Sequence, residues 1–154
     1  MLSKEERKAR NLAFWSAFKE VMRKKMSSNG RRVNWATYPT EIKDTYLRLN
    51  VDGQKATVSY DIQFKDSGVR AIFWEQLGEL RKVMEQHVSR PAEWREEVTQ
   101  TDGNTISQIV WTLENVSFYR DEDWAEIHQF FRSVLIEFDA FYQEFKDILI
   151  ALVD

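Results

Sequence analysis

The feature that most constrains this chain is a stripe of apolar residues in its C-terminal segment. From Ile127 to Leu152, large apolar side chains recur at alternating spacings of four and three residues. This periodicity predicts a single helix of about thirty residues. A second apolar row at Leu135, Tyr142 and Leu149 widens the stripe. A stripe of this width indicates a helix that is buried against several elements, not against one partner helix.

Alternation of polar and apolar residues predicts a β-hairpin in the first half of the chain. Apolar residues occupy every second position in Leu47–Val51, and the alternation resumes at Ala56 after Asp52 and Gly53. A two-residue Asp-Gly loop favours a tight hairpin turn, which would place Leu49 opposite Ala56. In that register apolar residues face apolar ones. One face of the hairpin is therefore expected to cover the core and the other to contact water.

The remaining periodic segments complete an order of α-β-β-β-α-β-β-α. They are a first helix opened by Ser3, a strand at residues 32–38, one helix after Asp66, and a second hairpin at residues 93–100 and 105–113. This order predicts an α+β fold, with a mostly antiparallel sheet and helices packed on one face. The 154 residues contain no linker or repeat, so we expect residues 1–154 to form a single domain.

Charge is distributed unevenly along the chain. Residues 1–32 hold ten Lys and Arg against three Asp and Glu, whereas residues 121–154 hold nine acidic residues against two basic ones. We expect the first and last helices to pack together on the apolar face of the sheet, so that these charges complement each other. The alternative is that the basic N-terminal segment contacts nucleic acid.

Several classes of protein are excluded or disfavoured by composition. The chain has no cysteine, which excludes disulfides and thiolate catalysis. No apolar run reaches the roughly 18 residues of a membrane span, and the charged N-terminus does not resemble a signal peptide. We therefore expect a cytoplasmic protein without membrane association. His87 and His128 stand alone on predicted helices, and no glycine-rich phosphate loop is present.

Two aspartates offer the one candidate metal site. In the predicted register Asp44 lies opposite Asp61, and facing carboxylates repel unless a cation such as Mg²⁺ lies between them. This is the arrangement of a divalent-metal-dependent nuclease, but that pattern also needs a lysine where this chain has Gln63. We expect Asp61 to face solvent and to bind no metal, and we keep the nuclease as the alternative function.

The polar face of the first hairpin offers a candidate binding surface. Tyr46, Arg48 and Lys55 could stack on or pair with a ligand there. The sequence thus favours a non-catalytic interaction module over an enzyme, with no cofactor, binding a protein or a nucleic-acid structure. We also predict self-association through spare apolar surface on the last helix or near Trp74.

Five tracts along the chain resemble a known family. They are NLAFWSAF, RVNWATY, LRLNVDGQKATV, FWEQLGEL and FYRDEDWAEIHQFF. Together they are similar, from about Asn11 to Phe145, to the bacterial domain of unknown function 4268. The resemblance implies a small protein in some bacteria and a domain following a nuclease-like region in others. It therefore implies an accessory role near nucleic acid and assigns no catalytic residue.

Overall fold

The computed structural model describes residues 2–153, which form helices and strands in an α+β arrangement. In chain order these elements are α1 (Lys4–Met22), η1 (Trp35–Thr37), β1 (Thr45–Val51), β2 (Lys55–Ile62), α2 (Ser67–Glu79), α3 (Arg81–His87), β3 (Glu93–Thr99), β4 (Thr105–Glu114), η2 (Asp121–Asp123) and α4 (Trp124–Val153). The expected α+β fold class is confirmed. None of the helices within the described residues has the length and apolarity needed to cross a membrane.

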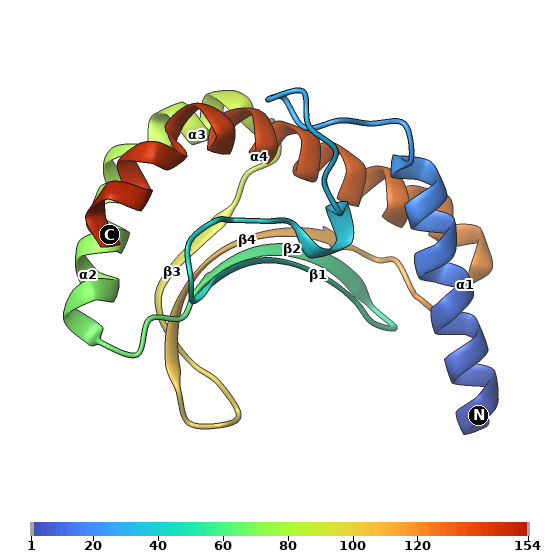
Figure 1. The fold of residues 1–154 in the computed structure, drawn as a ribbon. Coiled ribbons are helices and arrows are strands. Elements are labelled where there is room, and N and C mark those ends of the chain that lie inside the picture. The colour runs from blue at the N-terminus through green and yellow to red at the C-terminus, as the bar shows by residue number, and fades with distance from the viewer. Residues whose placement is uncertain (1, 154) are drawn as a thin grey trace.

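The four strands form one antiparallel sheet in the order β1-β2-β4-β3. Strands β1 and β3 are therefore its two edges. Figure 1 shows the sheet strongly curved, with α4 arching over one face and α1 standing near the tip of the β1–β2 hairpin. Helices α2 and α3 lie beside the C-terminal half of α4.

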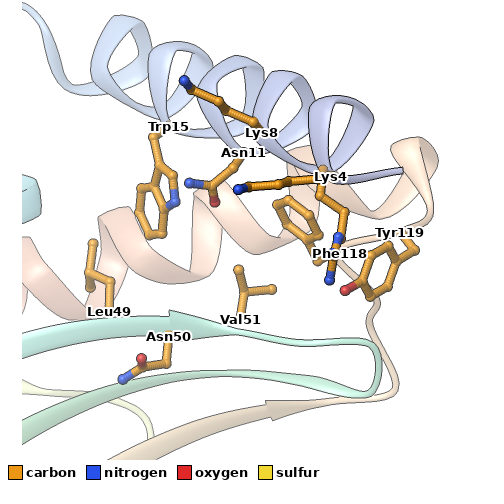
Figure 2. A pocket seen from close by; sticks show the side chains of 10 residues that line it. Lys4, Lys8, Asn11, Trp15, Leu49, Asn50, Val51, Phe118 and Tyr119 are labelled. Carbon is orange, nitrogen blue, oxygen red and sulfur yellow. The ribbon is translucent and has the colours of Figure 1, made fainter. Parts of the chain in front are cut away.

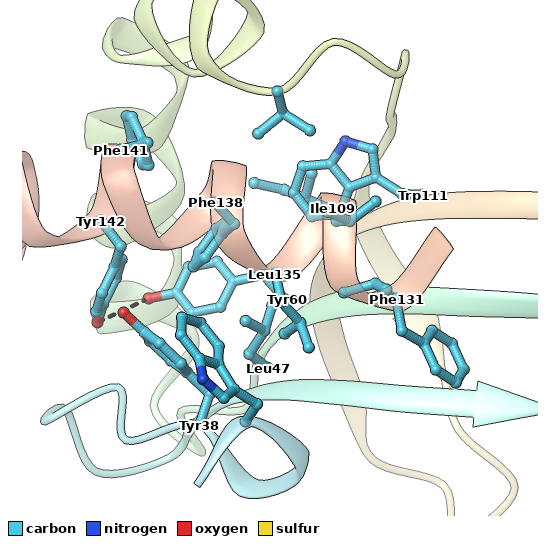
Figure 3. Packing of buried hydrophobic residues seen from close by; sticks show 14 of the residues in the cluster. Tyr38, Leu47, Tyr60, Ile109, Trp111, Phe131, Leu135, Phe138, Phe141 and Tyr142 are labelled. Carbon is cyan, nitrogen blue, oxygen red and sulfur yellow. Dashed lines mark hydrogen bonds between the residues drawn. The ribbon is translucent and has the colours of Figure 1, made fainter. Parts of the chain in front are cut away.

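The core lies between α4 and the sheet (Figure 3). The Phe138 ring lies 5.3 Å from the ring of Tyr60 on β2 and 5.8 Å from the ring of Trp111 on β4, measured between centroids. Phe131 and Tyr142 extend the same stripe along the helix and are fully buried. The predicted helix of about thirty residues is confirmed, since α4 has 30 residues, and the sheet is the broad partner that its wide stripe requires.

The predicted register of the first hairpin is wrong by two residues. Leu49 pairs with Val58, not with Ala56, and Ala56 instead pairs with Val51. The turn is longer than a two-residue loop because the Asp52 carboxylate accepts hydrogen bonds from the backbone N–H groups of residues 54 and 55, at 2.8 and 2.9 Å. A shift of two residues leaves every side chain on its original face, so the alternation of the sequence could not detect it.

The predicted strand at residues 32–38 is also wrong. Residues 35–37 form a short 3₁₀ helix, whose first turn is capped by the side chain of Asn34. This segment is held by side chains, because Trp35 is buried and Tyr38 donates a hydrogen bond of 2.6 Å to Asp139 on α4. The Asp139 carboxylate also accepts from the Ser27 hydroxyl, at 2.7 Å. The connection thus packs across α4 and adds no strand to the sheet.

The single helix predicted after Asp66 is divided into α2 and α3. The break falls at Leu80, whose φ and ψ of −91° and 0° are not helical. The Leu80 side chain is buried, and its backbone N–H donates to the carbonyl groups of Gln76 and Leu77. The break changes the direction of the chain, and both helices contact α4.

Candidate binding groove between helix α1 and strand β1

Helix α1 is anchored to the domain by its C-terminal half only. Its buried residues are Phe14, Phe18 and Met22, and the indole of Trp15 stacks on Phe131 of α4 with centroids 5.9 Å apart. The expected contact between the first and last helices is therefore confirmed. The N-terminal half, which begins with the predicted capping box of Ser3, buries no side chain. This half of α1 presents its polar residues to solvent.

Most of the basic residues at the N-terminus have no acidic partner. Arg10 pairs with Asp121 at 2.5 Å, and Arg23 pairs with Glu20 of its own helix at 3.2 Å. Eight cations form no ion pair within residues 2–153: Lys4, Arg7, Lys8, Lys19, Lys24, Lys25, Arg31 and Arg32. One ion pair, Arg10 with Asp121, joins the basic N-terminal segment to the acidic C-terminal one. Charge complementarity between the two segments stays a prediction for the other cations.

A groove runs between α1 and β1 beside these cations. We call it the α1–β1 groove, and it encloses about 510 Å³. In Figure 2, Leu49 and Val51 point up from β1 while Asn11 and Trp15 come down from α1, Lys8 extends along the helix, and Tyr119 closes one end. Its remaining lining residues are Lys4, Arg7, Asn50 and Phe118. The groove therefore combines an apolar floor with a basic wall.

Two further hollows share residues with the α1–β1 groove. One encloses about 660 Å³ and meets it at Trp15; its walls are apolar, and its rim carries Lys19, Arg23, Lys25 and Arg32. The other encloses about 220 Å³ and shares Leu49 and Asn50 with the groove. The basic and aromatic surface thus continues on both sides of the groove.

The predicted binding residues Tyr46 and Arg48 lie in the smallest hollow. The Arg48 guanidinium stacks over the Tyr46 ring, 4.4 Å from its centroid, and donates to the side-chain oxygen of Gln63 at 3.4 Å. Tyr46 is 40% exposed, so its ring can still be reached by a ligand. Lys55 is exposed at the start of β2, where it pairs with Glu114 of β4 in the sheet. The structure therefore brings Tyr46 and Arg48 together and leaves Lys55 apart at the hairpin turn.

The predicted facing pair of Asp44 and Asp61 does not form. Asp61 lies between Tyr46 on β1 and Gln108 on β4, because the register is shifted by two residues. Asp44 precedes β1 with a positive φ of 67°, and its carbonyl accepts from the backbone N–H of Gln63 at 2.8 Å. The geometric argument for a metal between the two carboxylates is lost. That Asp61 binds no metal stays a prediction, and a rise in thermal stability with Mg²⁺ or Mn²⁺ that Asp61→Asn abolishes would favour the alternative of a metal-dependent enzyme.

The expectation that Asp61 faces solvent is wrong, since it is only 4% exposed. Its carboxylate accepts from the Gln108 amide at 3.0 Å and lies 3.6 Å from the Arg48 guanidinium. Burial raises the pKa of the Asp61 carboxyl, against hydrogen bonds from Ser59 and Gln108 that lower it. Larger side chains on the neighbouring strands cover the carboxylate, although no helix packs on this face.

Neither histidine takes part in the groove. The His128 ring is buried against α1, with Nε2 3.1 Å from the carbonyl oxygen of Phe14. Burial lowers the pKa of His128. His87 is half-buried on α3, with Nδ1 2.9 Å from the carbonyl oxygen of Val83. Both imidazoles contact their own or a neighbouring helix.

Sequence reasoning missed most of the groove. It singled out Tyr46 and Arg48, which line the adjoining smallest hollow, but not Lys4, Lys8, Trp15 or Tyr119 of the groove, because these come together only when α1 docks beside β1. One signal was available, namely the excess of basic residues in the first 32 positions. This excess can indicate a contact with a separate anionic molecule, and that interpretation agrees better with the ion pairs of the structure than neutralisation by the C-terminal segment does.

The fold and the groove define a small α+β domain with a basic, aromatic-lined groove at one edge of its sheet. Residues 10–146 match the family described as Domain of unknown function (DUF4268), and the chain belongs to this family. The resemblance stated from the sequence is thereby confirmed. No curated protein and no solved structure matches the chain.

Proposed function

We propose that the protein is a non-catalytic interaction module that binds an anionic macromolecule along the α1–β1 groove. The observation that carries this proposal is the set of eight basic residues on and after α1 that form no ion pair within residues 2–153. Unpaired charges of one sign on one surface attract a partner of the opposite sign and accelerate its association. The partner is a separate molecule because the acidic residues of α4 pair elsewhere or face solvent.

The walls of the groove add the contacts that charge alone does not supply. Tyr119 is 53% exposed and the Trp15 indole is half-buried, so both present aromatic surface to a ligand. Aromatic side chains beside lysines and arginines are typical of surfaces that bind anionic chains. Leu49 and Val51 provide an apolar floor. A volume of about 510 Å³ is within the usual range of ligand sites.

The accessory role implied by the family resemblance is consistent with this proposal. A module that follows or accompanies a nuclease-like region needs a surface for that region or for its nucleic acid. The α1–β1 groove and the hollows beside it supply one such surface. No catalytic chemistry is needed for that role.

The test is a charge reversal with a matched control. Lys4→Glu combined with Lys8→Glu changes two cations that line the groove, whereas Lys24→Glu combined with Arg31→Glu changes two that line none of the three hollows. The probes are fluorescein-labelled poly-glutamate and fluorescein-labelled oligo(dT), and binding is measured by fluorescence anisotropy at several salt concentrations.

We expect the wild type to bind at least one probe, with an affinity that falls as salt rises. The groove variant should bind about tenfold more weakly or worse, while the control should stay within about threefold of the wild type. Equal losses in both variants would show that net charge alone drives binding and would contradict a role for the groove. Absence of binding to either probe at low salt would contradict the proposal as a whole.

A further inference from the structure

The free edge of β1 differs from the rest of the sheet in its backbone. In an antiparallel pair, residues alternate between hydrogen-bonded and non-bonded positions. The bonds from Asp52 N–H to the residue 55 carbonyl and from Gln63 N–H to the Asp44 carbonyl fix this alternation at both ends of β1. It follows that the N–H and C=O groups of residues 47, 49 and 51 point away from β2.

The same alternation explains a contact at the start of β1. Thr45 also points its backbone groups outward, and its N–H donates to the carbonyl of Ile42 at 3.2 Å while its carbonyl accepts from the Thr40 hydroxyl at 3.0 Å. The segment before β1 thus covers the first outward position. Within residues 2–153, no hydrogen bond reaches the outward groups of the next three, Leu47, Leu49 and Val51.

Two of these three residues, Leu49 and Val51, border open space, whereas Leu47 is only 4% exposed. The smallest hollow is lined by the consecutive residues 46–50, and the α1–β1 groove by residues 49–51. Side chains of consecutive strand residues alternate between the two faces of a sheet. A hollow that touches all of them must run along the edge of the strand, where their backbone is. The outward groups are therefore accessible at Leu49 and Val51, whereas at Leu47 residues 36–38 of the η1 segment form the opposite wall of the hollow.

The opposite edge of the sheet is protected. Strand β3 carries four charged residues among its seven and has an irregularity in its register between Arg95 and Val98. The bulge is fixed by the Ser107 hydroxyl, which donates to the carbonyl of Glu96 at 2.6 Å. Charges and bulges are devices that prevent another strand from adding to an edge. Strand β1 has a regular register throughout and a single charged residue, Arg48.

We propose that the α1–β1 groove binds an extended acidic peptide segment of a partner protein, which adds to the sheet as a fifth strand along β1. The backbone of that segment pairs with the outward groups of Leu49 and Val51, and its acidic side chains on one face meet Lys4, Arg7 and Lys8. This inference rests on the proposed function and names the class of partner for the same groove.

Two other occupants fit the edge less well. A nucleic-acid strand brings negative charge, but its sugar-phosphate backbone has no alternating donors and acceptors to pair with the outward groups of Leu49 and Val51. A second copy of this chain pairing through its own β1 brings the same basic rim, so like charges oppose it. An acidic peptide strand satisfies both the backbone and the charge.

The test uses three synthetic peptides of the same length, each with alternating Glu and Val. The first is unmodified, the second is N-methylated on every Glu, and the third is N-methylated on every Val. In an added strand, only every second residue points its N–H toward β1. One methylated peptide should therefore bind at least about tenfold more weakly than the unmodified peptide, because it loses backbone hydrogen bonds. The other methylated peptide should bind about as tightly as the unmodified one.

Amide hydrogen exchange in the protein supplies an independent readout. The N–H groups of Leu49 and Val51 should exchange at least about tenfold more slowly in the presence of the unmodified peptide, since each gains a partner. Oligo(dT) should leave their exchange unchanged. Peptide binding without this protection, or equal binding of both methylated peptides, would overturn strand addition.

The remaining outcomes separate this inference from the proposed function. Binding of oligo(dT) with no binding of any Glu-Val peptide would overturn the peptide inference and leave the proposed anionic partner standing. Protection of Leu49 by raised protein concentration alone, with a doubled mass in light scattering, would assign the edge to a second copy. Binding of no anionic probe at low salt would overturn both.

Discussion

The side of the sheet covered by α4 and the side lined by α1 differ in how completely their residues find partners within the chain. Beneath α4, Phe131, Phe138 and Tyr142 are fully buried, and every buried side-chain nitrogen or oxygen within residues 2–153 has a hydrogen-bond partner. On and after α1, eight cations lack an ion pair within residues 2–153, and the outward backbone groups of Leu49 and Val51 on β1 have no partner strand there. The first side supplies the stability of the domain. The second side carries charged and hydrogen-bonding groups that have no partner within the described part of the fold.

The largest expected effect lies on the α4 side. Phe138→Ala should lower the free energy of unfolding by about 4 kcal/mol, because the fully buried ring contacts both Tyr60 and Trp111. Ile148→Ala on the same helix is the control, since Ile148 is exposed, and it should cost less than about 1 kcal/mol. Urea denaturation followed by tryptophan fluorescence measures both. Similar losses would mean that α4 is not packed as described.

The next effect concerns the buried carboxylate that joins α4 to the segment after α1. Asp139→Ala should cost about 3 kcal/mol, because it leaves the Ser28 N–H and the hydroxyls of Ser27 and Tyr38 without their acceptor. Asp147→Ala, an exposed carboxylate on the same helix, serves as the control. A cost for Asp139→Ala no greater than that of the control would contradict the buried network.

A smaller effect should appear as a pH dependence of stability. Burial lowers the pKa of His128 below the value of about 6.5 that it has in the unfolded chain. Between these two pKa values the unfolded state takes up a proton that the folded state does not. Stability is therefore full above pH ~6.5 and falls as pH drops, by at most about 1.4 kcal/mol for each pH unit.

Denaturation at several pH values between neutral and mildly acidic measures this slope. His128→Gln should reduce it, while His87→Gln serves as the control for loss of an imidazole. Carboxylates also titrate at the lowest of these pH values, so the contribution of His128 is taken from the difference in slope between the two variants. An unchanged slope in His128→Gln would contradict a neutral, buried His128.

The smallest effect on stability should come from the α1 side. The combined Lys4→Glu and Lys8→Glu variant should change the free energy of unfolding by less than about 0.5 kcal/mol, since both side chains are exposed and unpaired. Its effect should appear in binding alone. A large loss of stability would show that these lysines belong to the fold, and it would remove the contrast between the two sides.

The sequence predicted the parts of the fold that repeat over short distances. The spacing from Ile127 to Leu152 predicts α4 because the whole pattern lies within one helix. The turn at residues 101–104 predicts the second hairpin because the pattern lies within one pair of strands. Residues 32–38 alternate like a strand, but Tyr38 donates a hydrogen bond to Asp139, which is more than a hundred positions away. No local pattern contains that information.

The candidate site was predicted less well because it depends on tertiary contacts. Asp61 occupies a polar position in a pattern that indicates a wet face, yet Tyr46, Arg48 and Gln108 cover it from the two adjacent strands. The groove itself needs α1 beside β1, which the sequence order does not specify. Charge was the one property of residues 1–32 that indicated a partner, and the partner it first suggested was α4.

The position of α4 in the chain has a consequence for synthesis. Every element that α4 covers, from Phe14 on α1 to Trp111 on β4, precedes it in the sequence. During translation the apolar face of the sheet and the aromatic side of α1 are therefore complete before their common cover has left the ribosome. The two hairpins are local and can form early. Tyr60 and Trp111 then stay exposed to water until α4 has been synthesised and Phe138 packs against them. The nascent chain is most in need of a chaperone in that interval.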